Sequence, residues 1–217
     1  MVAGGTGSRF GGHKQFELLG GRPVLAWSIA AARTVADGIV VVVPKGTPES
    51  AADPPSADDL GADRVVTGGA TRSGSVRAGL AAVPAEAAVI IVHDAARPLA
   101  SASLFASVLD ALSEDDVCGA VPVLPVSDTL KWTKDDQVFS TVDRDGMVSV
   151  QTPQAFVASV LRDAHADGRD ATDDAGLLEA LGARVRTVPG EPRNLKLTHP
   201  EDLTLARALL QIEREAR

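Results

Sequence analysis

The sequence predicts an α/β fold, in which helices cover both faces of a doubly wound, mostly parallel β-sheet. Short runs rich in Val and Ile alternate along the chain with helical patterns, as expected of strand–helix units. The runs are continuously apolar, which is typical of strands buried on both faces. A chain of 217 residues with 45% hydrophobic content can bury one sizeable core, so we expect a single domain over residues 1–217.

The alternation of apolar runs with helical patterns predicts where each strand and helix lies along the chain. A surface loop is expected at residues 51–63, which include Pro54 and Pro55. A last helix should follow Thr198, because Thr198 and Glu201 have the spacing of a capping box. We expect strands at residues 39–43, 65–67, 89–92 and 120–123, and helices at 24–34, 75–82, 104–112 and 172–181.

Residues 122–146 differ from the rest of the chain. Their pattern changes to Thr, Val and charged residues without a strong core run. Such a composition predicts an extended arm or hairpin that leaves the main body. We expect a partner surface to cover this arm.

A glycine loop with two cations opens the chain. Residues 3–7 read Ala-Gly-Gly-Thr-Gly, and Arg9 and Lys14 follow. Glycines let backbone amides approach an anion, and nearby cations neutralise charge that grows on a phosphoryl group during transfer. The loop therefore predicts a nucleotide site, with a plain strand-to-helix turn as the alternative. The Walker pattern is excluded because Gln15 follows Lys14, and the dinucleotide pattern is incomplete because Phe10 stands at its third glycine.

Only Met1, Val2 and Ala3 precede these glycines. A core strand normally has about five residues. We expect either an unusually short first strand or further residues ahead of Met1.

A polar cluster follows the apolar run at residues 89–92. Ligands collect at the carboxyl ends of parallel strands, so Asp94 can approach a metal or a substrate hydroxyl, and Arg97 can bind a phosphate. The alternative is an ion pair that braces the turn before Pro98. His93 is expected to be structural, because no serine or thiol of the nucleophile-elbow type accompanies it.

Two further segments carry candidate ligand contacts. In the turn at residues 67–75, the amides and hydroxyls around Gly69 and Ser75 could contact the edge of a base, with helix capping as the alternative. Lys196 lies in an apolar run that we expect to be a strand. Loss of solvation would penalise its charge unless it met an anion, which favours a functional role.

Composition excludes several classes. The net charge is −8 and the cations are dispersed, so we expect no nucleic-acid partner and a small substrate. The single cysteine, Cys118, is expected to be a small core residue. Neither a membrane span nor a signal peptide is predicted, and the expected location is cytoplasmic.

Eight motifs together carry a resemblance to a known family. The motifs are AGGTGSRF with KQF, GGATRSGSV, VHDAARP, PVSDTLK, TVDR, QTPQAF, TDDA and NLKLTHPEDL. With these motifs in this order, the chain resembles the 2-C-methyl-D-erythritol 4-phosphate cytidylyltransferases of the non-mevalonate isoprenoid route. His13 departs from the family, which usually has proline before the lysine.

The resemblance implies a Rossmann-like nucleotidyltransferase fold and a reaction of CTP with methylerythritol phosphate. It implies a divalent cation, Mg²⁺, held mainly by the triphosphate and near Asp94. It also implies a homodimer in which the 122–146 arm crosses to the partner subunit, so that Thr129 and Arg144 would serve the partner's site.

Roles follow from the resemblance residue by residue. The catalytic residues would be Arg9, Lys14, Arg144 and Lys196. The CTP site would comprise Ala3, Gly4, Gly5, Thr6, Gly7, Gly69, Ser75 and Asp94. The sugar phosphate would contact Asp94, Arg97, Thr129, Arg144, Thr152, Thr172 and Lys196.

Two other functions stay open at this point. Ribitol-5-phosphate cytidylyltransferase is similar in fold and shares several motifs, although PVSDTLK and TVDR favour methylerythritol phosphate. A catalytically silent nucleotide-binding module is the other, because a fold alone does not establish an activity.

Overall fold

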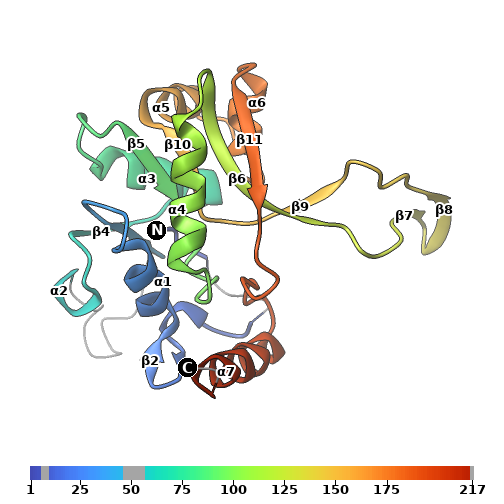
Figure 1. Cartoon of the computed structure of the whole chain (residues 1–217), viewed down its shortest axis with the longest axis horizontal. Coiled ribbons are helices and arrows are strands. Elements are labelled where there is room, and N and C mark those ends of the chain that lie inside the picture. Colours follow the sequence, from blue (N-terminus) through green and yellow to red (C-terminus); the bar gives the residue numbers. More distant parts are fainter. Residues whose placement is uncertain (6–9, 46–56, 216–217) are drawn as a thin grey trace.

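The computed structural model describes residues 1–5, 10–45 and 57–215. It confirms the α/β fold (Figure 1). The largest sheet has the order β11-β6-β10-β5, and β9 pairs with β6. Its strands are β5 (Val89–Val92), β6 (Val117–Pro125), β9 (Val148–Val150), β10 (Gln154–Val157) and β11 (Arg184–Pro189).

Val2 joins this sheet to a second pair of strands. β3 (Val40–Val43) and β4 (Arg64–Thr67) are parallel, and Val2 forms parallel bridges to Val42 on one side and to Asp94 on the other. β6 and β11 are also parallel, whereas β9 and β10 run antiparallel to their neighbours. The sheet is therefore of mixed direction.

Helices lie on both faces of the sheet, as the doubly wound prediction requires. One apolar cluster joins α1 (Val24–Ala32) and α4 (Ala102–Asp110) to β3, through Ile29, Phe105 and Val41. Another cluster joins α3 (Arg72–Ala82), α5 (Ala158–His165) and α6 (Ala175–Ala180) to β5 and β10. The strands are apolar on both sides because both sides are covered.

A third apolar cluster holds the C-terminal helix. α7 (Pro200–Glu215) packs Leu203, Ala206 and Leu210 against Leu19 and Val24. No helix within the described ranges is long and apolar enough to cross a bilayer. The remaining short elements are η1 (Lys14–Phe16), β1 (Leu18–Leu19), β2 (Arg22–Pro23), α2 (Ala57–Leu60) and η2 (Ala111–Ser113).

The C-terminal segment corrects two predictions. Residues 194–198 do not form a strand, although the Leu197 amide donates to the carbonyl of Ala96 at 2.8 Å. The cap of α7 uses Asp202 and not Glu201, since the Asp202 carboxylate accepts the amides of Thr198 and His199 at 2.6 and 2.8 Å. A carboxylate in the first turn also favours the positive end of the helix dipole.

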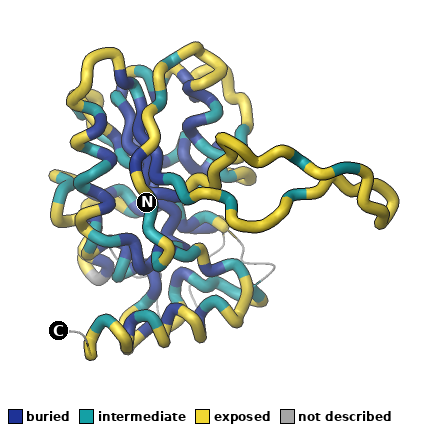
Figure 2. The backbone as a smooth tube through the Cα atoms, turned by 45° about the vertical axis from the view of Figure 1, so that its right-hand side comes forward, coloured by how far each residue is buried: buried dark blue, intermediate teal, exposed yellow. Residues whose placement is uncertain are grey.

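The arm is an exposed hairpin. β7 (Lys131–Lys134) and β8 (Gln137–Thr141) pair only with each other in the part of the chain described, and they project from the sheet at one end (Figures 1 and 2). Trp132 and Phe139 are 66% and 78% exposed. The projecting part begins later than residue 122, because β6 stays paired with β11 up to Val123.

Candidate active site

A cavity of about 360 Å³ lies where the strands around Val2 end. The chain enters it through Ala3, Gly4 and Gly5, which follow the Val2 bridges directly. Residues 94–96 bring in the segment after β5, and residues 69–72 bring in the start of α3. This is the carboxyl edge of parallel strands, where open α/β sheets bind ligands.

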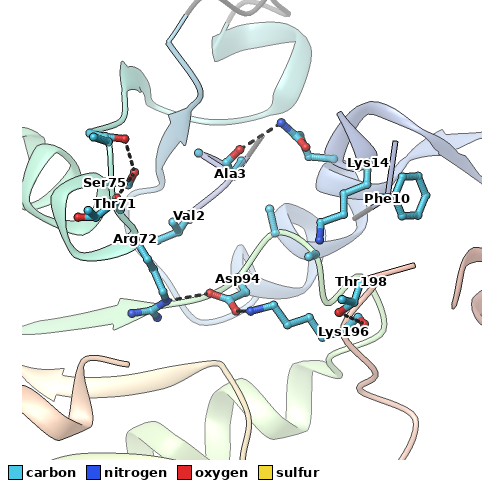
Figure 3. A pocket seen from close by; sticks show the side chains of 17 residues that line it. Val2, Ala3, Phe10, Lys14, Thr71, Arg72, Ser75, Asp94, Lys196 and Thr198 are labelled. Carbon is cyan, nitrogen blue, oxygen red and sulfur yellow. Dashed lines mark hydrogen bonds and ion pairs between the residues drawn. The ribbon is translucent and has the colours of Figure 1, made fainter. Parts of the chain in front are cut away.

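Cations dominate the charge of this cavity. Among the described residues that line it, Lys14, Arg72 and Lys196 are cationic and Asp94 is the one carboxylate. Figure 3 shows Lys14 and Lys196 reaching in from one side and Arg72 from the other, with Asp94 between them. Such a surplus of positive charge favours a polyanionic ligand.

Asp94 is held by both flanking cations. Lys196 Nζ donates to Asp94 Oδ2 at 2.6 Å, and Arg72 Nε lies 3.5 Å from Asp94 Oδ1. Burial alone would raise the pKa of Asp94, but the charges of Lys196 and Arg72 outweigh it and lower this pKa to about 2. Asp94 is therefore ionised at neutral pH, and it is the anion that pairs with Lys196.

Arg72 is fixed from beneath by a second carboxylate. Its Nη1 lies 2.8 Å from Asp174 Oδ2, and Oδ1 of the same fully buried carboxylate lies 3.0 Å from His165 Nε2. A guanidinium between two carboxylates stays charged, and its pKa is raised: burial lowers it, but Asp174 and Asp94 more than offset burial.

The opposite wall is built on η1. The buried Gln15 donates from Nε2 to the carbonyl of Ala3 at 3.1 Å, which ties η1 to the glycine segment. Lys14 Nζ donates to the carbonyl of Leu197 at 2.5 Å. Lys14 is thereby anchored beside Lys196, although the two residues come from opposite ends of the chain.

Two glycines allow backbone segments to meet at the cavity. A Cβ added to Gly4 would lie 2.8 Å from Ser75 Oγ, and one added to Gly69 would lie 2.8 Å from the carbonyl carbon of Gly74. A side chain at Gly69 would therefore require backbone movement. The Thr71 side chain accepts the Gly74 amide at 2.9 Å and caps α3, so the capping alternative for this turn also holds.

The structure thus brings many of the predicted site residues to one place. The predicted site residues that line the cavity are Ala3, Gly4, Gly5, Lys14, Gly69, Ser75, Asp94 and Lys196. The predicted site residues Thr6, Gly7 and Arg9 lie outside the described part of the chain.

Arg97 and Thr152 support the site from beneath and do not line the cavity. Arg97 Nη1 donates to the carbonyl of Asn194 at 2.7 Å. The buried Thr152 hydroxyl accepts the Asp94 amide at 3.0 Å and lies 3.1 Å from His93 Nδ1. The Thr152 hydroxyl thus holds the Asp94 backbone in place, and its predicted contact with the substrate stays a prediction.

His93 is structural, as expected. Its Nε2 lies 3.2 Å from the carbonyl of Arg97, and burial lowers its pKa to about 3. A neutral ring accepts from Thr152 at Nδ1 and donates to this carbonyl at Nε2. His93 therefore links the turn after β5 to Thr152.

Three other predicted substrate residues lie away from the cavity. Thr129, Arg144 and Thr172 are exposed and do not line it. Arg144 Nη1 donates to the carbonyls of Val126 at 2.9 Å and Asp128 at 3.2 Å, and it also contacts that of Ser127. Within its own subunit, Arg144 therefore closes the base of the hairpin.

Sequence reasoning missed Arg72 and Gln15. Arg72 is the first residue of α3, where the helix dipole disfavours a cation, so its position was a signal that a carboxylate must lie nearby. Gln15 carried no such signal. It stands beside Lys14 on η1, and only the fold shows that its side chain turns toward Ala3.

The cavity has few oxygen donors for a metal. The described residues hold no group of three or more His, Cys, Asp or Glu side chains that could ligate an ion. Asp94 is ionised but already touches Lys196 and Arg72. This donor set fits a divalent cation only if the ligand supplies most of its coordination.

Comparisons with known proteins agree with this geometry. The sequence model of the family 2-C-methyl-D-erythritol 4-phosphate cytidylyltransferase (IspD) matches residues 1–212. The cytidylyltransferase of Thermus thermophilus is 44% identical over 217 residues, covering 98% of this chain and 96% of its own length. The crystal structure of the Thermus thermophilus enzyme superposes with a TM-score of 0.82 at 40% identity, over 97% of this chain and 96% of that one.

Other relatives are longer than this chain. The bifunctional enzyme IspD/IspF of Solidesulfovibrio magneticus is 43% identical over 221 residues, which cover 94% of this chain and 54% of the relative. The chain thus spans about half the length of several curated relatives that it matches. By its match to the family over nearly its whole length, the chain belongs to the 2-C-methyl-D-erythritol 4-phosphate cytidylyltransferases.

Proposed function

We propose that this chain transfers a cytidylyl group from CTP to 2-C-methyl-D-erythritol 4-phosphate, giving 4-diphosphocytidyl-2-C-methyl-D-erythritol and pyrophosphate. The observation that carries the proposal is the convergence of Lys14, Arg72 and Lys196 on one cavity beside the glycine segment. Three cations around one carboxylate suit a triphosphate, whose leaving pyrophosphate gains negative charge during transfer.

The reaction requires positioning and charge stabilisation more than covalent help from the protein. A phosphate oxygen of the sugar alcohol attacks the α-phosphorus of CTP in line, and the bond to the pyrophosphate oxygen breaks. The attacking group is already an anion, so no general base is needed. Lys14 stabilises the charge on the leaving pyrophosphate together with Arg9, and Lys196 orients the incoming phosphate.

The α3 side of the cavity binds the base. Gly69 and Ser75 offer a backbone and a hydroxyl close to Gly4, so the cytosine and the triphosphate can occupy one continuous surface. Lys196 and Arg72 keep Asp94 ionised on that surface. Asp94 is then available to the substrate hydroxyls and to the metal.

Mg²⁺ is the proposed cofactor, with Asp94 as the residue that would hold it beside the triphosphate. The ion, when bound, neutralises phosphate charge in the transition state. The ionised state of Asp94 supports this role, and the cations around it are consistent with a metal coordinated mainly by CTP.

The working unit is proposed to be a cytoplasmic homodimer in which the arms are exchanged. Trp132 and Phe139 on the β7–β8 hairpin are exposed, and neighbouring large apolar side chains on a surface favour a binding partner. Exchange of the arms would bury them against the other subunit. Thr129 and Arg144 would then contact the sugar phosphate in the partner's site. Arg97, Thr152 and Thr172 would act from their own subunit.

A pyrophosphate-release assay tests the proposed function. Pyrophosphate should appear with CTP and methylerythritol phosphate, and its rate should exceed that with ribitol 5-phosphate by at least about tenfold in kcat/KM. A higher value with ribitol 5-phosphate would reassign the substrate. No release with either phosphate, from protein that binds CTP, would make this chain a nucleotide-binding module.

A further inference from the structure

Part of the loop between α5 and α6 is docked on the first turn of α3. We call residues 169–171 the docked segment and residues 69–75 the base turn. The buried Ser73 hydroxyl donates to the carbonyl of Ala171 at 3.3 Å and accepts the Ala171 amide at 3.1 Å. One hydroxyl thus satisfies both backbone groups of a loop residue.

Arg77 holds the docked segment from the same face of α3. It follows Ser73 by four positions, so the two side chains point the same way from the helix. Arg77 Nη1 donates to the carbonyl of Arg169 at 2.9 Å, and Nη2 donates to Asp170 Oδ1 at 3.2 Å. All three residues of the docked segment are therefore held by side chains of α3.

Asp170 also reaches the base turn itself. Thr71 Oγ1 donates to Asp170 Oδ1 at 2.8 Å, and the same oxygen accepts the Gly74 amide at 2.9 Å. A hydroxyl has only one proton to donate. Because Asp170 accepts that proton, the lone pairs of Thr71 Oγ1 stay directed toward Gly74. Asp170 thereby orients the hydroxyl that caps α3.

The cap acts on the surface that we propose for the base. Gly74 packs so closely on Gly69 that a Cβ at Gly69 would lie 2.8 Å from the Gly74 carbonyl carbon. Ser75 Oγ donates to the Thr71 carbonyl at 3.0 Å, and Figure 3 shows Thr71 and Ser75 on the α3 side of the cavity. Gly69, Thr71 and Ser75 line the cavity, whereas Asp170 does not. An unbroken set of contacts therefore leads from Asp170 to the cavity wall.

We propose that Asp170 and Ser73 are positioning residues, which hold the base turn in the conformation that binds the cytosine of CTP. The inference rests on the proposed function, because it takes Gly69 and Ser75 as the contacts of the base. Neither positioning residue lines the cavity. Asp170 acts through the Thr71 hydroxyl, and Ser73 keeps Asp170 within reach of that hydroxyl by fixing the next residue of the loop.

Calorimetric titration with CTP and Mg²⁺ tests Asp170. The Kd for CTP should rise by about fivefold in Asp170→Ala, because the cap loses its orienting acceptor. Asp170→Asn keeps an oxygen that accepts from Thr71, so it should recover most of the affinity. Asp163→Ala is the control, since Asp163 is an exposed carboxylate of α5 that does not line the cavity. CTP is titrated alone because Thr172, a predicted contact of the sugar phosphate, directly follows the docked segment.

Pyrophosphate separates a positioning role from general damage to the fold. It has no base, and we expect it on the side of the cavity that Lys14 lines. Its Kd, measured with Mg²⁺, should therefore stay within about twofold of the unaltered value in Asp170→Ala. The Tm should also change little, since the Asp170 side chain is 52% exposed.

Double variants test the route of the effect. Ser73→Ala should weaken CTP binding to a similar degree, because Ala171 loses its partner and the docked segment is released. In a Thr71→Ala background, Asp170→Ala should add less than about twofold to the Kd, since the hydroxyl that it orients is gone.

Three outcomes would overturn the inference. These are an equal Kd for CTP in Asp170→Ala and the unaltered protein, an equal weakening of CTP and pyrophosphate, and a full effect of Asp170→Ala without the Thr71 hydroxyl. Unaltered protein that fails to bind CTP would overturn both this inference and the proposed function. Unaltered protein that binds CTP but releases no pyrophosphate would refute only the proposed function, because the titrations do not depend on turnover.

Discussion

Arg72 Nη1 lies 2.8 Å from Asp174 Oδ2, and the Asp174 side chain is entirely buried beneath the active-site cavity. The same guanidinium reaches Asp94 at the cavity wall. Arg72 therefore connects a buried carboxylate to one that faces the ligand. Its position in the site is fixed by a buried residue that does not line the cavity.

This relationship predicts how the pair responds to substitution. Arg72→Ala should lower the free energy of unfolding by about 3 kcal/mol, because it leaves the charge of Asp174 buried with only His165 beside it. Adding Asp174→Ala should restore part of that loss. Urea unfolding of the two single variants and the double variant measures the coupling. Additive losses would mean that the pair is not energetically coupled.

Lys14 is predicted to act on the transition state. Lys14→Ala should lower kcat by about 10² to 10³, with a smaller change in KM for CTP, as expected on loss of one preorganised cation. Lys45→Ala is the matched control, since Lys45 is exposed and does not line the cavity. A normal kcat in Lys14→Ala, from protein with an unchanged Tm, would contradict the assignment.

Gly69 is predicted to matter through backbone contact. In Gly69→Ala the added Cβ would meet Gly74 at 2.8 Å and displace the turn that faces the base. We expect KM for CTP to rise by about tenfold, equivalent to roughly 1.4 kcal/mol. At Gly12 a Cβ meets nothing within 4 Å, so Gly12→Ala is the control. If the two variants behave alike in steady-state kinetics, the turn does not contact the base.

Acid should destabilise the protein through His93. Its pKa falls from 6.5 to about 3 on folding, mainly because it is buried, so the unfolded chain binds the proton more tightly. The stability contributed by neutral His93 is complete above pH 6.5 and declines as the pH falls toward 3. Between pH 7 and 4.5 the loss should be about 2 kcal/mol. Denaturant unfolding at several pH values should show that the free energy of unfolding of His93→Gln depends less on pH than that of the unaltered protein. Equal slopes for the two proteins would assign the acid response to other groups.

The parts of the candidate site that could be predicted from the sequence are those marked by residues close together in the chain. The glycine segment, Lys14 and Asp94 were found because glycines beside cations and a carboxylate after a buried strand have few other uses. The strands predicted at residues 39–43, 65–67, 89–92 and 120–123 were found because each is a short apolar run, and the arm was found because such a run is missing there. These signals all lie within a few neighbouring residues.

The features that were missed depend on distant contacts. β10 was not predicted because it begins at the polar Gln154 and has only three apolar residues before α5 starts. The Gln154 side chain is buried, and its amide donates to Asp173 and to the carbonyl of Gln151. The link between the Thr152 hydroxyl and His93, which is 59 residues away in the chain, was not predicted either. Long-range pairing of this kind leaves no periodic signal in a sequence.

The last prediction is that each active site contains residues of two subunits. In its own subunit Arg144 closes the base of the exposed hairpin, away from the cavity that Lys14 lines, so a shared site requires the arm to reach a partner. Arg144→Ala and Lys14→Ala should each be nearly inactive. If the two are mixed while subunits exchange, about half of the dimers are mixed, and each has one intact site and one doubly altered site. About a quarter of all sites should then recover activity in the pyrophosphate-release assay. Two separate preparations of the Lys14→Ala variant, mixed in the same way, give the baseline activity, because every site in that mixture carries the Lys14→Ala change. Mixed dimers that form, as native mass spectrometry can verify, but that stay at this baseline would place Arg144 in the site of its own subunit.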